Sequence, residues 1–82
     1  MTAQQITDLI NIGAEQKVRQ YFKKLSLKDR LPKLWELTPY VGDTPKTLYF
    51  FRENFAREIG ALIMTKGDFE ESEILYNQAK KN

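Results

Sequence analysis

Apolar residues in the first third of the chain recur at intervals of three or four positions. They are Ile6, Ile10, Ala14, Val18, Tyr21, Phe22 and Leu25. This spacing is typical of one face of an α-helix, and Thr2 is a suitable N-cap residue in front of it. We therefore expect one helix over residues 3–25, with Gly13 in its interior at a cost of about 1 kcal/mol relative to alanine.

Prolines divide the middle of the chain. Pro32 disfavours a helix that begins at Ser26, so a short helix over residues 32–38 is expected to start at this proline. The run TPYVGDTP, residues 38–45, holds two prolines and one glycine and therefore predicts a loop.

The last part of the chain contains two helical segments around a glycine. Thr44 before Pro45 is typical of a helix start, and Gly67 of a left-handed helix end. These signals predict helices over residues 45–66 and 69–81. The whole pattern predicts an all-α fold, with residues 1–82 as a single domain. It has three main helices and a short middle one, and it ends in a tight αα-hairpin.

The segment from about Asn54 to Asn82 resembles a tetratricopeptide-repeat hairpin. The resemblance is carried by Ile59, Gly60, Ile63, Gly67, Asp68, Phe69, Ser72, Tyr76 and Ala79. It implies that small residues let two helices approach closely while Ile59, Ile63 and Tyr76 fill the space between them. It also implies binding to other proteins or stacking on like hairpins. Ala56 departs from the family pattern, which has a large aromatic residue there, and any tight αα-hairpin with a glycine cap converges on similar spacing.

The residue types present argue against catalysis and metal binding. The chain has no Cys and no His, which removes the commonest nucleophile–base pairs and metal ligands. The carboxylates of Glu53 and Glu58 are interpreted as parts of solvated faces. The acidic run from Asp68 to Glu73 is interpreted as favourable charge at a helix N-terminus. We therefore expect no enzyme activity, no catalytic residues, no metal site and no cofactor.

Charge is unevenly distributed along the chain. Residues 17–33 hold seven basic residues and one acidic residue, a net charge of +6, whereas the rest of the chain carries −4. The basic residues are Lys17, Arg19, Lys23, Lys24, Lys28, Arg30 and Lys33. This basic face would suit a nucleic-acid backbone. A basic outer face more often serves solvation, or steering of an acidic protein partner.

Ten aromatic residues are many for a chain of 82 residues. Tyr49, Phe50 and Phe51 are consecutive, so they cannot all point to one side of a helix. Exposed aromatic residues commonly mark an interaction surface. We therefore expect a protein-contact patch formed by Trp35, Tyr40, Tyr49 and Phe50.

Together these features predict a non-catalytic protein-binding module, a small cytoplasmic adaptor, inhibitor or regulator. Its partner would be a protein with an acidic surface, and a homodimer is plausible. One alternative is a nucleic-acid-binding module that uses residues 17–33. Another is an accessory regulator of the phage type that acts by self-association. No stretch approaches eighteen apolar residues and no secretory signal is recognisable, so a membrane location is not expected.

Overall fold

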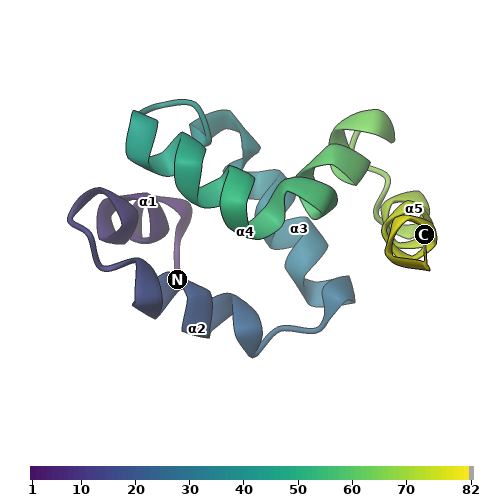
Figure 1. Cartoon of the computed structure of the whole chain (residues 1–82), viewed down its shortest axis with the longest axis horizontal. Coiled ribbons are helices and arrows are strands. Elements are labelled where there is room, and N and C mark those ends of the chain that lie inside the picture. The colour runs from purple at the N-terminus through teal and green to yellow at the C-terminus, as the bar shows by residue number, and fades with distance from the viewer. Residues whose placement is uncertain (82) are drawn as a thin grey trace.

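The computed structural model describes the backbone of residues 1–81 and the side chains of residues 1–79, so Asn82 lies outside the described residues. Within this range the fold is all-α, as predicted, and contains no strand (Figure 1). The elements in chain order are α1 (Ala3–Asn11), α2 (Glu15–Lys23), α3 (Leu27–Leu37), the 3-10 turn η1 (Thr38–Tyr40), α4 (Pro45–Met64) and α5 (Phe69–Lys81).

The predicted single helix over residues 3–25 is wrong, because Gly13 ends one helix and separates it from the next. Gly13 has φ +87°, a left-handed conformation that glycine adopts without strain. The Gly13 N–H donates to the Ile10 carbonyl at 3.1 Å, and the Ala14 N–H donates to the Leu9 carbonyl at 2.8 Å. These bonds close the end of α1 as a glycine C-cap. The chain then turns so that α2 packs back on α1.

The predicted short helix over residues 32–38 is also wrong, because α3 begins at Leu27 and contains Pro32 in its interior. Ser26 caps it: its Oγ accepts the Asp29 N–H at 3.2 Å. Pro32 removes one backbone donor. Leu31, Leu34 and Leu37 are fully buried along one face of α3, and this burial outweighs the lost hydrogen bond.

Helix α4 is the central element of the fold. It crosses the molecule with α1 near its N-terminal end and α5 at its C-terminal end (Figure 1). The predicted helix over residues 45–66 ends slightly earlier, at Met64. It bends at Phe55, whose φ of −137° and ψ of 23° are not helical. Lys66 and Gly67, both with positive φ, then form the turn into α5.

One hydrophobic core joins α1, α2, α3 and α4. Its buried members are Ala3, Ile6, Ile10, Val18, Phe22, Leu31, Leu34, Leu37, Phe50, Phe51, Phe55 and Leu62. The rings of Phe22 and Phe55 lie 4.8 Å apart between centroids, so they connect α2 to the bend of α4. Helix α5 contributes differently: among its described side chains only Ser72 is buried. The Ser72 Oγ lies 2.7 Å from Thr65 Oγ1 and 3.3 Å from the Ala61 carbonyl, so the two helices approach closely there.

The molecule measures 34 × 23 × 23 Å along its principal axes. Its long axis runs from the α1–α2 end to the α5 end (Figure 1). No helix within residues 1–81 is both long and apolar enough to cross a membrane.

Candidate interaction surface

The predicted aromatic patch does not form as expected, because Phe50 is buried. Only 2% of its surface is exposed, and its ring packs edge-on against Phe51 at 5.4 Å between centroids. The Arg19 guanidinium lies 5.5 Å from the centre of the same ring. Helix α4 is covered by α1 on one side and by α3 on another, so a wide arc of it is buried and Phe50 and Phe51 both point inward.

The other three predicted contact residues are exposed to different degrees: Trp35 by 36%, Tyr40 by 37% and Tyr49 by 62%. Two of them, Trp35 and Tyr49, lie far apart. Trp35 packs on Gly67 in the turn between α4 and α5. Tyr49 lies near the opposite end of α4, about fifteen residues before Met64, which is roughly 22 Å of helix.

Part of the predicted basic face is used inside the fold. The Arg30 Nη1–H donates to Glu58 Oε2 at 3.1 Å, and Glu58 is only 5% exposed. The interpretation of Glu58 as a solvated carboxylate is therefore wrong. Arg19 donates from Nε to Asn54 Oδ1 at 3.2 Å and from Nη2 to Glu15 Oε2 at 3.0 Å. Arg30 and Glu58 are 28 residues apart in the chain, so no local sequence pattern indicated that they form a pair.

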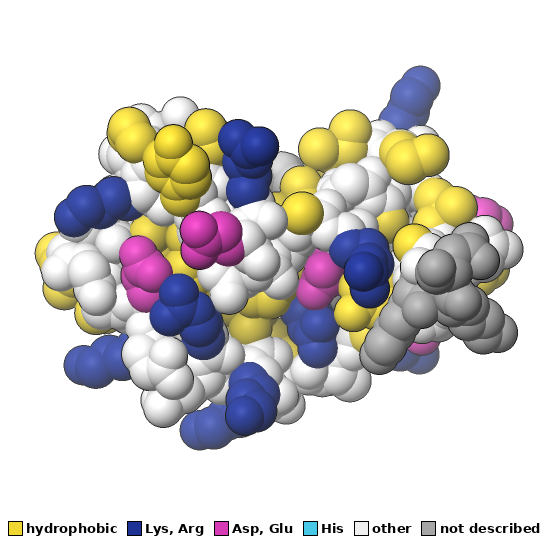
Figure 2. Space-filling view, viewed as in Figure 1, with side chains coloured by type: hydrophobic (Ala, Val, Ile, Leu, Met, Phe, Trp, Pro, Cys, Tyr) yellow, Lys and Arg dark blue, Asp and Glu magenta, His cyan; other side chains and the backbone are white. Residues whose placement is uncertain are grey.

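Of the remaining basic residues, one forms an ion pair within its own helix and the other four, among the described residues, do not. The Lys33 Nζ lies 3.5 Å from Glu36 Oε2 on the next turn of α3. Lys17, Lys23, Lys24 and Lys28 are exposed, and none of them forms an ion pair with a described residue. Figure 2 shows Lys and Arg side chains spread along the edge of the molecule that α2 forms.

A small cleft between α2, α3 and α4 has three cationic side chains in its walls. It has a volume of about 200 Å³ and is lined by Arg19, Phe22, Lys23, Arg30, Asn54 and Phe55. Both guanidinium groups already donate to protein acceptors. The cleft therefore resembles a structural seam between helices more than a prepared anion site.

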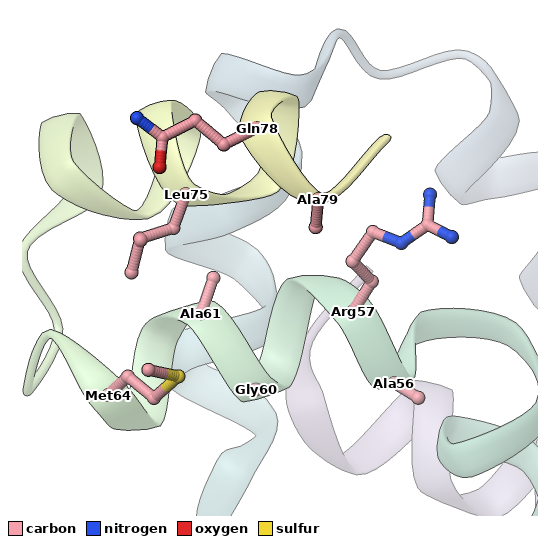
Figure 3. Close-up of a pocket in the computed structure, with 8 residues that line it drawn as sticks. All are labelled: Ala56, Arg57, Gly60, Ala61, Met64, Leu75, Gln78 and Ala79. Atoms are coloured by element: carbon pink, nitrogen blue, oxygen red, sulfur yellow. The ribbon is translucent and has the colours of Figure 1, made fainter. Parts of the chain in front are cut away.

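A largely apolar hollow lies between α4 and α5 (Figure 3). This α4–α5 groove has a volume of about 390 Å³ and is lined by Ala56, Arg57, Gly60, Ala61, Met64, Leu75, Gln78 and Ala79. A second hollow of about 220 Å³ lies along the other side of α4, and both share Ala56 and Gly60.

The ridge between the two hollows is an uncovered apolar face of α4. We call it the α4 stripe, made of Ala56, Gly60, Ile63 and Met64. Their spacing of four, three and one residues places them on one side of the helix. Ile63 is 61% exposed and Met64 is 76% exposed. In Figure 2, hydrophobic side chains gather over this end of the molecule.

Two expectations for the hairpin change with this geometry. Ile63 was expected between α4 and α5 but points to solvent. Gly60 was expected at the close approach of the helices, but a Cβ added there would have no atom within 4 Å. The close contact occurs one residue later, between Ala61 and Ser72. Gly60 therefore belongs to the outward stripe and is open to a partner.

The described residues hold no group of three or more Asp, Glu, His or Cys side chains that could bind a metal ion. The fold and its surface define a small all-α domain with an uncovered apolar helix face. Comparison of the chain with protein-family models, with curated proteins and with solved structures finds no match. The surface itself is therefore the basis for assigning a function.

Proposed function

We propose that this protein is a non-catalytic protein-binding module, a small adaptor, inhibitor or regulator, and that its partner docks on the α4 stripe and the α4–α5 groove. The observation that carries the proposal is the exposure of Ile63 and Met64 beside an apolar groove. A contiguous apolar patch of this kind on a small domain is typical of an interaction site.

Burial of this face would favour binding. Full burial of an isoleucine or methionine side chain stabilises by about 1.5–3 kcal/mol. Both side chains already keep part of their surface covered, so each would contribute roughly 1–2 kcal/mol to docking. Ala56 and Gly60 leave room for a side chain of the partner to approach the helix backbone, which improves packing.

Charged residues border this face and would orient a partner. Arg57 lines the α4–α5 groove, and Arg52 lines the hollow on the other side of α4. Both are exposed and would attract acidic groups on the partner. The resemblance of residues 54–82 to a tetratricopeptide-repeat hairpin supports the same class of function.

The test is an affinity pull-down from the lysate of the source cell, with nuclease, at low and at high salt. We expect the wild-type protein to capture a protein partner under both salt conditions. Gly60→Arg places a charged side chain in the middle of the stripe, at a position where an added Cβ meets no atom within 4 Å, and should abolish capture.

Gly42→Arg is the matched control, because Gly42 also has no neighbour within 4 Å of an added Cβ and lies in the turn before α4. It should capture the partner as the wild type does. Undiminished capture by Gly60→Arg would contradict the proposed docking site.

Nucleic-acid binding is a second candidate, favoured by the four exposed lysines between residues 17 and 28, which lack ion pairs among the described residues. In that case the pull-down would recover nucleic acid instead of protein. Binding would fall steeply as salt rises, because each phosphate contact releases a counterion. Lys17→Glu with Lys24→Glu would then abolish it, and Gly60→Arg would leave it intact.

A further inference from the structure

We infer that helix α5 is a hinged unit of the fold, which opens from the core of α1–α4 about Lys66 and Gly67 while that core stays folded. Three features support this inference: what α5 buries, the turn that joins it to α4, and the polar contacts that position it. The opening is a property of the chain alone. Its consequence for the α4–α5 groove rests on the proposed function.

The hydrophobic core contains no described side chain of α5. Its buried members, and the partly buried apolar side chains packed against them, all lie within residues 3–62. Helix α5 packs on α3 and α4 from outside this core. None of its described apolar side chains is fully buried, and Phe69 and Ile74 are 39% and 49% exposed. Because burial of apolar surface is what opposes opening, α5 should open at a lower cost than the core helices.

The turn between α4 and α5 is a strained hinge. Lys66 has φ +54°, a left-handed conformation that is unfavourable for a residue with a Cβ atom. Gly67 follows with φ +85°, which glycine adopts freely. These two residues set the direction in which α5 leaves α4. Once α5 detaches, Lys66 can return to a favourable backbone conformation, so the release of strain favours opening.

Polar contacts at Ser72 position α5 in the closed state. The Ser72 Oγ lies 2.7 Å from Thr65 Oγ1 and 3.3 Å from the Ala61 carbonyl oxygen. On opening, these groups exchange their hydrogen bonds for bonds to water, so the net contribution of the contacts is modest. They define where α5 sits, and they leave the open state within reach.

Opening removes one wall of the α4–α5 groove. Leu75, Gln78 and Ala79 form the wall that α5 contributes (Figure 3). The groove therefore exists only while α5 is closed. A partner seated in the groove would shift the equilibrium toward the closed state, because a ligand favours the state that it binds. In this way α5 would regulate the docking site proposed above.

The experiment is native-state hydrogen exchange of the full chain in low concentrations of urea, resolved helix by helix. We expect amides in the middle of α5 to exchange about a hundredfold faster than the slowest amides of α4, since a helix this short melts once it detaches. Their rates should depend only weakly on urea, because a local opening exposes little surface. Exchange of α4 and α5 through one shared global opening would overturn the inference.

Two substitutions distinguish the opening of α5 from unfolding of the whole molecule. Thr44→Ala weakens the end of α4 that contacts Asn11 of α1. It should speed the slowest amides of α1–α4 by about tenfold or more and leave α5 unchanged, because the open state keeps these contacts. Ser72→Ala removes contacts that the open state lacks, so it should speed exchange in α5 by about tenfold. Equal acceleration of α4 and α5 by Thr44→Ala would contradict a separate opening.

A reversible cross-link tests the hinge itself. Thr65→Cys combined with Ser72→Cys places two sulfur atoms where the hydroxyl oxygens lie 2.7 Å apart, which suits a disulfide. The chain has no other cysteine. Oxidised glutathione would close the bond, and exchange in α5 should slow to about the rate of α4. Reduction with dithiothreitol should restore fast exchange in the same protein. Fast exchange in the oxidised form would contradict a hinge at Lys66 and Gly67.

The two proposals fail in different ways. Exchange is measured on the chain alone, so a single cooperative unit overturns the hinge whether or not a partner docks on α4. A partner that the wild type captures and Gly60→Arg does not should slow exchange in α5 when it is bound, because the groove requires the closed state. If α5 opens in the free protein and the bound partner leaves its exchange unchanged, the hinge stands and the partner does not occupy the groove.

Discussion

Gly67 fits its position for two separate physical reasons. Its φ is +85°, which side chains other than glycine rarely adopt. In addition, a Cβ placed on it would lie 2.7 Å from Cε2 of Trp35, closer than contact allows. Gly13 has nearly the same φ, +87°, but nothing lies within 4 Å of an added Cβ. Substitutions at the two glycines therefore allow the cost of backbone strain to be measured separately from the cost of a packing clash.

We expect Gly67→Ala to lower the free energy of unfolding more than Gly13→Ala. Gly13→Ala should cost about 1–2 kcal/mol, the left-handed penalty alone. Gly67→Ala should cost about 3 kcal/mol, because overpacking against Trp35 is added. Urea unfolding followed by circular dichroism measures both. Trp35→Leu should reduce the Gly67→Ala cost to that of Gly13→Ala, and equal costs in the wild-type background would show that the ring adapts freely.

At the scale of elements, the start of α4 is held more firmly than the start of α1, although both begin with a capping box at a threonine. The Thr44 Oγ1 accepts the Thr47 N–H at 3.2 Å and also lies 2.7 Å from Asn11 Oδ1 at the end of α1. The Thr2 Oγ1 accepts only the Gln5 N–H, at 3.1 Å, among the described groups. Thr44 thus caps one helix and joins it to another.

Thr44→Ala should therefore destabilise the protein by about 2 kcal/mol and Thr2→Ala by about 1 kcal/mol or less. The difference reflects the lost bond to Asn11. The midpoints of urea unfolding of the two variants provide the measurement. Thr44→Ser keeps the hydroxyl group and should recover most of the stability. A loss at Thr2 as large as that at Thr44 would argue against the role of the Asn11 bond.

At the scale of the whole molecule, a charged pair connects α3 to α4 at the edge of the core. Glu58 is 5% exposed, and it receives a hydrogen bond from Arg30 at 3.1 Å. Arg30 also donates from Nη2 to the Leu25 carbonyl at 3.3 Å, while its buried Nε has no partner among the described groups. A pair with an incompletely satisfied guanidinium contributes little net stability, but each partner depends on the other.

Arg30→Met should lower the free energy of unfolding by about 3 kcal/mol, because Glu58 would remain buried without a compensating charge. The double variant with Glu58→Leu should be more stable than Arg30→Met alone. Chemical denaturation of wild type, both single variants and the double variant gives the coupling energy. Additive effects would show that Glu58 is hydrated or repaired by another group once Arg30 is removed.

The candidate site was only partly predictable from the sequence. The surplus of aromatic residues and the helical hairpin at the end of the chain were both recognisable. However, the ring at Phe50 is buried, whereas Ile63, expected inside the hairpin, is exposed. Both errors arose on α4. The arc of that helix that is buried depends on where α1, α3 and α5 pack against it, and local sequence does not carry this information.

Short-range signals in the sequence alone determined the all-α class, the caps at Thr2 and Thr44 and the glycine turn at Gly67, because each depends on neighbours a few residues away. Tertiary structure decided that Gly13 ends a helix, that Pro32 lies inside one and that Arg30 pairs with Glu58. It also decided which face of α4 stays uncovered. Those outcomes depend on burial and on contacts between distant segments, and these exist only once the helices have packed.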